Sequence, residues 1–190
     1  MSQHSRNERN ANSGLVVALE PDDLAPFERF PGDPLAGIAL QRQLEERAFR
    51  LGGSCYAAPA QRLEDFLAAR PSTRLGAIAA SYQPGVHPAD LDVLLPSPIV
   101  EALREALPAF ARKLKGYDHP DAVLTGVETR TSSPVRIPRD EALESLNVKG
   151  LVPAGEGAGY AGGILSAGID GIRAAEALAL QILQTRSPSP

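Results

Sequence analysis

The stretch at residues 150–183 constrains the fold more than any other part of the sequence. A short apolar segment at residues 151–154 predicts a buried strand, and a turn dense in glycine follows it. After that turn the sequence favours a single helix, because no proline occurs before Pro188. A strand, a glycine turn and a helix in this order place the N–H groups and the positive dipole of a helix N-terminus at the turn. The stretch therefore predicts a cradle for an anion or a dinucleotide.

Gly157, Gly159 and Gly162 fit the G-x-G-x-x-G spacing of dinucleotide-binding turns. In a Rossmann unit a second strand follows the helix, and an acidic residue lies about 20 positions after the motif. Glu176 lies near that distance but inside the helical run, and residues 184–190 are too few to complete a βαβ unit. The motif is therefore expected to close a sheet and not to open one. A tight turn without a ligand is the alternative at this point.

Very small side chains recur at every fourth position of the expected helix. They are Gly163, Ala167, Gly171, Ala175 and Ala179. Residues four apart lie on one helix face, so the pattern predicts a face that closely approaches a sheet or a flat ligand. Glycine inside a helix costs up to about 1 kcal/mol relative to alanine, which indicates that close approach is what these positions require. Ordinary helix–sheet packing is the alternative explanation.

The rest of the sequence predicts strands and helices in mixture. Strands are expected at residues 15–19, 56–60, 123–131 and 135–137, and the third shows the best alternation in the chain. Helices are expected at residues 34–51, from residue 63 to a point before Pro71, and at 97–115, with Pro108 kinking or splitting the last of them. A short helical turn is expected at residues 140–146. The predicted fold class is α/β, with strands and helices mixed.

Charge and composition exclude several classes of protein. The net charge is −4 at pH 7 and no basic block stands out, so a nucleic-acid partner is not expected. No apolar run approaches the ~18 residues of a membrane span, and residues 1–13 are too polar for a signal peptide. The single cysteine, Cys55, excludes an intramolecular disulfide and fits a reducing cytosol. We therefore expect a cytoplasmic protein.

Few other residues carry recognisable chemistry. The three histidines do not share metal-ligand spacing, and the run from Asp118 to Asp121 is better interpreted as a solvated loop than as a metal site. No catalytic residue can be assigned by spacing. A cation and hydroxyls follow one another at Arg130, Thr131 and Ser132, where a strand is expected to end. Such a cluster fits a carboxylate substrate or a flavin edge, and a purely structural polar turn is the alternative.

Several motifs in order resemble one family. The run GEGAGYAGG at residues 155–163 looks like the C-terminal flavin motif of FAD-dependent dehydrogenases related to the two-domain FAD/NAD(P)-dependent oxidoreductases. Three further motifs share the resemblance: GVETRTSSPVRI at 126–137, DPLAGI at 33–38 and RPST at 70–73. The likeness runs from about residue 6 to residue 180. Members of that family begin with their own strand, glycine turn and helix, and nothing before Gly157 matches that pattern.

The resemblance implies FAD as cofactor and a flavin contact at the glycine turn. Glu156 would lie near the ribityl chain, and Gly162, Gly163 and Ile164 near the pyrimidine edge of the flavin ring. The implied cofactor-binding set is completed by three further glycines of the motif: Gly155, Gly157 and Gly159. A helix N-terminus there would stabilise negative charge on the reduced ring.

The resemblance also implies a domain organisation. The expected parts are a flexible segment at residues 1–13, part of a substrate or insert domain at 14–121, and a disordered tail at 185–190. Between them, residues 122–184 would form return strands and the final strand, glycine turn and helix of an FAD-binding domain. The N-terminal dinucleotide-binding βαβ unit of the two-domain fold would be lacking.

Three hypotheses remain at this level. The chain is the C-terminal portion of an FAD-dependent oxidoreductase that acts on a small-molecule substrate. Alternatively, it is a non-catalytic remnant or subunit that needs the N-terminal half as a separate chain to hold FAD. In the third hypothesis it is a small anion-binding module. Under the first two, the chain alone is expected to be inactive, and FAD is not expected to stay bound to it.

Overall fold

The computed structural model describes residue 5, residue 7 and residues 9–186. The chain divides into two compact units, which we call unit 1 and unit 2. Unit 1 comprises residues 1–23 and 40–129, and unit 2 comprises residues 24–39 and 130–190. The remaining residues, which belong to the N-terminal segment and the C-terminal tail discussed above, lie outside the described part of the chain.

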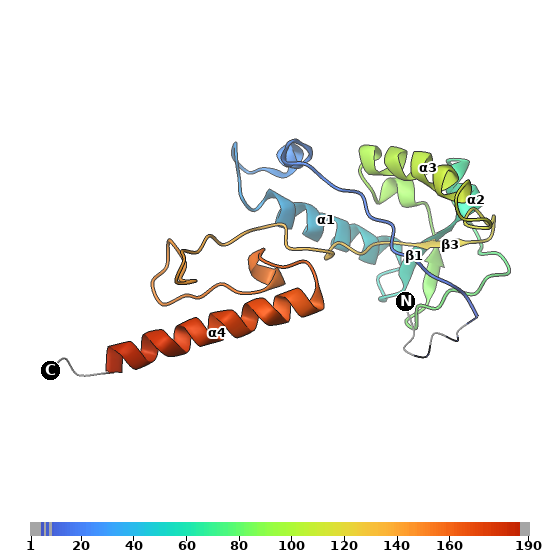
Figure 1. Cartoon of the computed structure of the whole chain (residues 1–190). Helices are drawn as coiled ribbons and strands as arrows, with labels where there is room; N and C mark the ends of the chain where they lie inside the picture. Colours follow the sequence, from blue (N-terminus) through green and yellow to red (C-terminus); the bar gives the residue numbers. More distant parts are fainter. Residues whose placement is uncertain (1–4, 6, 8, 187–190) are drawn as a thin grey trace. The chain divides into compact units, whose positions relative to one another are not determined.

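Unit 1 is built on a small mixed sheet with the strand order β2-β1-β3. The central strand β1 (Ala58–Arg62) pairs in parallel with β2 (Val86–Pro88) and antiparallel with β3 (Val123–Thr125). Helix α2 (Leu63–Leu67) follows β1 directly, and the short 3-10 helix η2 (Leu91–Val93) leads to α3 (Ser97–Ala111) (Figure 1). The long helix α1 (Ala36–Leu51) contributes its last turns to this unit.

The core of unit 1 joins the helices to the sheet. Its buried members come from α1, α2, the η2 region and α3, and they are Ala48, Leu63, Phe66, Leu91, Leu94, Val100 and Leu107. The amide of Gln61 is also fully buried in β1, where its Nε2 donates to the carbonyl of Arg70 and its Oε1 accepts from the amide of Leu91. A buried polar side chain with both ends bonded is tolerated in such a core.

Replacing Phe66 with alanine should lower the free energy of unfolding of unit 1 by about 3–5 kcal/mol, because the lost ring leaves a cavity. Phe66 is 0% exposed, whereas Phe49, which is 38% exposed beside Tyr56, offers a matched control. Phe49→Ala should cost clearly less, and urea unfolding of the two variants measures the difference. Equal losses for both variants would mean that the core is not centred on Phe66.

Unit 2 consists of an N-terminal turn region, an irregular return segment and a long helix. The 3-10 helix η1 (Pro21–Phe27) leads to Asp33, whose Oδ1 accepts from the amide of Leu35 before α1 begins. Arg29 donates from Nε and Nη2 to the same carboxylate and holds the pKa of Asp33 well below its usual range. The 3-10 helix η3 (Glu156–Ala158) and helix α4 (Ile164–Arg186) form the C-terminal part (Figure 1).

The helices and the mixed α/β class agree with the sequence. Leu40, Leu44 and Ala48 line the buried face of α1, and Gly53 ends the helix with a φ of +88°. α3 begins at Ser97 as predicted and runs through Pro108 to Ala111 without splitting.

Most of the predicted strands are wrong. Residues 15–19, 135–137 and 151–154 form no strand, and the expected strand at 123–131 is reduced to Val123–Thr125. Leu151 is 41% exposed and its segment contains Pro153, which has no amide to donate to a ladder. Residues 56–60 are replaced by a strand two residues later, and residues 140–146 form a turn closed by an Arg139–Ser145 bridge instead of a helical turn.

The stripe of small residues on α4 does not lie on one face. A spacing of four advances by about 40° per step around a helix of 3.6 residues per turn. Gly163, Ala167 and Gly171 are accordingly half-buried, whereas Ala175 and Ala179 are exposed. The packed side of α4 continues instead through Ala174, which is 5% exposed.

Candidate functional site

The glycine turn lies between the irregular segment ending at Pro153 and the start of α4. Gly155 has φ 69° and ψ −160°, a combination essentially restricted to glycine. Gly159 is left-handed with φ +82°, and a Cβ there would lie 2.7 Å from the carbonyl oxygen of Val135. The amides of Gly159 and Tyr160 donate back to the carbonyls of Glu156 and Gly155. The fold of the chain itself therefore requires glycine at positions 155 and 159.

Gly157 and Gly162 differ from those two glycines. Neither has a left-handed φ, and a Cβ added at either would meet nothing within 4 Å. Gly163 also has no left-handed φ, and its Cβ would meet only Ser166 Oγ at 3.4 Å. Nothing in the described chain requires these three residues to lack side chains. Gly157 leaves bare backbone in η3, and Gly162 and Gly163 leave it immediately before α4, where a flat molecule can lie close to the chain.

The start of α4 offers hydrogen-bond donors on that surface. The first amides of a helix have no acceptor inside the helix, and its dipole is positive there. Ile164, the first residue of α4, is 92% exposed. Glu156 is half-buried in the turn and has no ion pair among the described residues. The predicted residues Gly155 to Ile164 thus run through η3 to the first residue of α4.

An ion pair that the sequence did not predict holds this turn. Arg139 Nη2 donates to Asp170 Oδ1 at 2.6 Å and Arg139 Nη1 to Asp170 Oδ2 at 3.0 Å. The hydrogen bonds from Arg139, and then the one from the amide of Gly155, lower the pKa of Asp170 to about 2. The two residues are 31 positions apart. No spacing rule links them, so no sequence pattern predicts the pair.

The ring of Tyr160 in the glycine turn contacts two arginines. The guanidinium of Arg139 lies 3.7 Å from the ring centroid and that of Arg136 lies 4.4 Å from it. The hydroxyl of Tyr160 donates to the carbonyl of Ile137 at 2.9 Å. Arg136 is exposed and has no carboxylate within ion-pair distance among residues 5, 7 and 9–186. An exposed arginine, Arg136, therefore lies beside the turn. It belongs to the motif at residues 126–137, but no sequence pattern predicts a role for this residue.

Two of the three predicted substrate-binding residues, Thr131 and Ser132, are exposed, and in the described chain no hydrogen bond joins either of them to the glycine turn. The neighbouring Ser133 makes that contact, since its Oγ donates to the carbonyl of Gly157 at 3.2 Å. A role for Arg130, Thr131 and Ser132 in binding a substrate remains a prediction.

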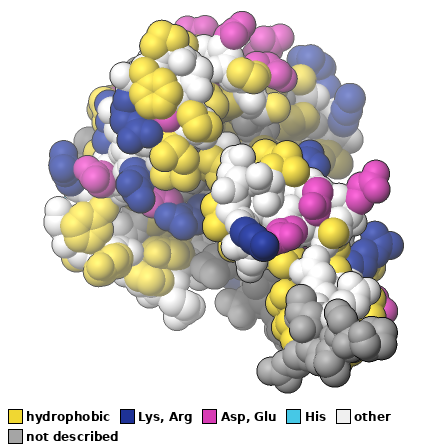
Figure 2. Space-filling model, turned by 90° about the vertical axis from the view of Figure 1, so that its left-hand side faces the viewer, with side chains coloured by type: hydrophobic (Ala, Val, Ile, Leu, Met, Phe, Trp, Pro, Cys, Tyr) yellow, Lys and Arg dark blue, Asp and Glu magenta, His cyan; other side chains and the backbone are white. Residues whose placement is uncertain are grey.

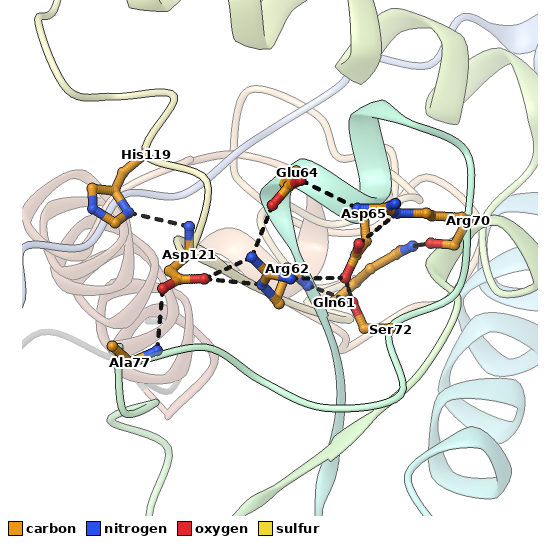
Figure 3. A network of polar contacts seen from close by, with 9 residues as sticks. All are labelled: Gln61, Arg62, Glu64, Asp65, Arg70, Ser72, Ala77, His119 and Asp121. Carbon is orange, nitrogen blue, oxygen red and sulfur yellow. Dashed lines mark hydrogen bonds and ion pairs between the residues drawn. The ribbon is translucent and has the colours of Figure 1, made fainter.

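The loop from Asp118 to Asp121 belongs to a polar network within unit 1 (Figure 3). Asp121 Oδ1 accepts from Arg62 Nε at 3.0 Å, and its Oδ2 accepts from the amide of Ala77. These contacts, with the Ala77 bond first, lower the pKa of Asp121. His119 Nδ1 accepts from the amide of Asp121 instead of facing a ligand. Among the described residues no group of three metal-ligating side chains exists.

The same network anchors the proline-rich loop that follows α2. Asp65 Oδ2 accepts from Ser72 Oγ and Asp65 Oδ1 from Arg70 Nε, both at 2.7 Å. Figure 3 shows these side chains converging beside Arg62. The bond from Ser72 and the charge of Arg70 lower the pKa of Asp65 against the cost of its burial. The network thus has a structural role at the end of the central strand β1.

The chain belongs to the family described as FAD-dependent protein, C-terminal domain-like, whose model matches residues 1–131. The family predicted from the motifs is thereby confirmed. The match ends before the glycine turn, so it does not itself assign the turn to flavin.

One relative extends beyond that match. A protein of Clostridium beijerinckii described as an uncharacterized protein is 51% identical over 177 residues. The alignment covers 93% of this chain and therefore runs past residue 131 and through the glycine turn. It covers 32% of the relative, so the chain spans about a third of that protein's length.

Proposed function

We propose that this chain is the C-terminal portion of an FAD-dependent oxidoreductase and that its glycine turn contacts the flavin. The observation that carries the proposal is the bare backbone at Gly157 in η3 and at Gly162 and Gly163 immediately before α4. These glycines have no left-handed φ and no crowded neighbour, so a ligand lying against them is the best physical reason for their lack of side chains. Membership of an FAD-dependent family gives the class of that ligand.

The residues of the turn fit a flavin by their chemistry. The amides of Gly162, Gly163 and Ile164 would face the pyrimidine edge of the ring, and Glu156 would accept from the hydroxyls of the ribityl chain. Bound FAD supplies the hydride or electron transfer. The protein contributes position and field, because the positive end of α4 favours negative charge at its start. A dehydrogenase acting on a small molecule in the cytoplasm is the corresponding activity.

A complete FAD site needs more than this turn. The pyrophosphate of FAD carries two negative charges and is usually held by a second glycine turn at a helix start. No such strand–turn–helix precedes residue 153 in the described chain, where β1 runs directly into α2. We therefore infer that the remaining part of the site comes from a region equivalent to the two thirds of the relative that has no counterpart here.

The outer face of α4 supports that inference. Opposite its packed side, the helix carries large apolar residues that include Leu165 at 82% and Ile172 at 70% exposed. Figure 2 shows hydrophobic side chains, in yellow, on the segment that leads to the grey C-terminal residues. A helix face with several large, exposed apolar side chains is typical of a surface that binds a partner. Within the described residues no helix is both long and apolar enough to cross a membrane.

Co-expression with the missing region tests the proposed function. The chain would be produced together with the two thirds of the Clostridium beijerinckii protein that it does not match. We expect a complex that co-elutes in size-exclusion chromatography and shows flavin absorption at about one FAD per complex. A stable complex that is colourless, even with FAD added, would count against the flavin contact.

The exposed face of α4 should also make the isolated chain associate with itself. Replacing Leu165 and Ile172 with serine should shift the chain toward monomer, because the apolar area that drives association is reduced. Val93→Ser in unit 1 is the matched control, since Val93 is 61% exposed but lies outside α4. Sedimentation velocity over a concentration series measures the effect. A wild-type chain that is monomeric at all concentrations would contradict the expectation.

A further inference from the structure

The ion pair between Arg139 and Asp170 has no part in the flavin contact proposed above, yet it is among the best-defined features of unit 2. Both side chains are largely buried, with 10% and 14% of their surface exposed. The guanidinium meets the carboxylate with two parallel hydrogen bonds, the geometry that gives arginine–carboxylate pairs both strength and direction. Such a pair fixes the relative position of the segments that carry it.

The pair also binds the backbone just before the glycine turn. Arg139 Nη1 donates to the carbonyl oxygen of Pro153 at 2.6 Å, and the amide of Gly155 donates to Asp170 Oδ2 at 2.8 Å. One residue pair therefore satisfies a carbonyl and an amide two residues apart. Gly155 is in a sparsely populated conformation, and such conformations persist only where the surroundings determine them strongly.

The pair has an electrostatic consequence as well. Asp170 lies in the second turn of α4, close to the start of the helix. Arg139 neutralises the carboxylate of Asp170. The negative charge of Asp170 therefore does not cancel the positive electrostatic potential at the start of α4. Without Arg139, the largely buried carboxylate of Asp170 would have no ion-pair partner next to the glycine turn. Such a carboxylate lowers the stability of the fold and repels anions.

We propose that Arg139 is a positioning residue of the glycine turn: acting through Asp170, it fixes Gly155 and with it residues 156–163 in the conformation that meets the flavin. The role toward flavin rests on the proposed function, whereas the role toward the turn does not.

Hydrogen exchange and flavin titration of the full chain separate the two roles. In Arg139→Gln, amide exchange in residues 153–163 should become at least tenfold faster, while exchange in α3 stays unchanged. The dissociation constant for FMN should rise at least tenfold. The double variant Arg139→Gln with Asp170→Asn should recover part of the FMN affinity, because it removes the unpaired carboxylate without restoring the clamp.

Arg104→Gln is a matched control. Arg104 forms a similar pair with Asp92 and also donates to the backbone carbonyl of Phe66, but it lies in unit 1. It should change neither the exchange of residues 153–163 nor FMN binding. If Arg139→Gln does not fold, Arg139→Lys replaces it, because lysine keeps the charge without the two parallel hydrogen bonds. Its amide exchange and FMN affinity should change in the same direction but by less.

The outcomes can be told apart. Unchanged exchange of residues 153–163 in Arg139→Gln would overturn the positioning role. FMN binding that is equally tight in the wild type and in Arg139→Gln would overturn the role of Arg139 toward flavin while leaving the proposed function intact. Absence of FMN binding by the wild-type chain would overturn the proposed function, and the exchange result would then alone decide whether Arg139 fixes the turn.

Discussion

FAD added to the purified 190-residue chain should be lost on dialysis, leaving a colourless protein. Under the proposed function, the glycine turn would contact only the flavin and the ribityl end of the cofactor. The usual cradle of the pyrophosphate is not found among the described residues, and its contacts are worth several kcal/mol. Since every ~1.4 kcal/mol changes the dissociation constant tenfold, tight binding becomes negligible without them.

The visible spectrum after dialysis decides this prediction. Free FAD carried through the same steps provides the baseline, and denaturing the protein before the final spectrum detects any cofactor that remains. Retention of about one FAD per chain would show that the described turn is sufficient for tight binding. The inference that a further region is needed to complete the FAD site would then be wrong.

Replacing Gly163 with aspartate should stabilise the helix and weaken flavin binding at the same time. Gly163 immediately precedes α4, and a carboxylate at a helix start is favourable by about 0.3–1 kcal/mol. Its φ is not left-handed and its Cβ would meet only Ser166 Oγ, so the fold accepts the side chain. A flavin at this place would lose its space and face a new negative charge in a partly dry site. We expect at least tenfold weaker FMN binding.

Gly163→Ala separates crowding from charge. It adds a single methyl group and should weaken binding less than the aspartate does. Thermal unfolding measured on each variant shows whether the helix start is intact. A stably folded Gly163→Asp variant with unchanged affinity for FMN would remove the start of α4 from the site.

Helices were the predictable part of this fold. The regular apolar spacing of Leu40, Leu44 and Ala48 predicts that one face of α1 is buried, and all three side chains are buried in the structure. In α3 the apolar spacing predicts the helix but not its buried face, since Leu107 is buried as the spacing requires whereas Phe110 is 40% exposed and the buried Val100 lies outside the pattern. A helix satisfies its own backbone, so local pattern and caps carry most of the information.

Strands were predicted poorly because each needs a partner elsewhere in the chain. The apolar run at residues 15–19 has the composition of a buried strand, yet no strand pairs with it among the described residues and Val16 is 68% exposed. The alternation at residues 123–131 is real, but only Val123–Thr125 meets the ladder of β1. The composition of a segment indicates that it can form a strand, but it does not predict which other strand will pair with it.

The site was predictable in its glycines and not in its support. Gly157 and Gly162 stand in a motif that can be found by spacing alone. The contacts of Asp170 with Arg139 and Gly155 arise only when α4 packs on the turn, so no sequence pattern announces them. The small-residue stripe was misplaced for a simpler reason, since four residues exceed one helical turn.

The central claim, that flavin lies on the glycine turn, is tested most directly by an NMR titration of the isotope-labelled chain with FMN. FMN carries the flavin ring and ribityl chain, and binding on the order of 1 mM, about −4 kcal/mol, is sufficient for the experiment. We predict that the amides of Gly157, Gly162, Gly163 and Ile164 shift together, while those of Gly76 and Gly116 in unit 1 do not. No shift at these four amides at millimolar FMN, or equal shifts at the unit 1 glycines, would contradict the account.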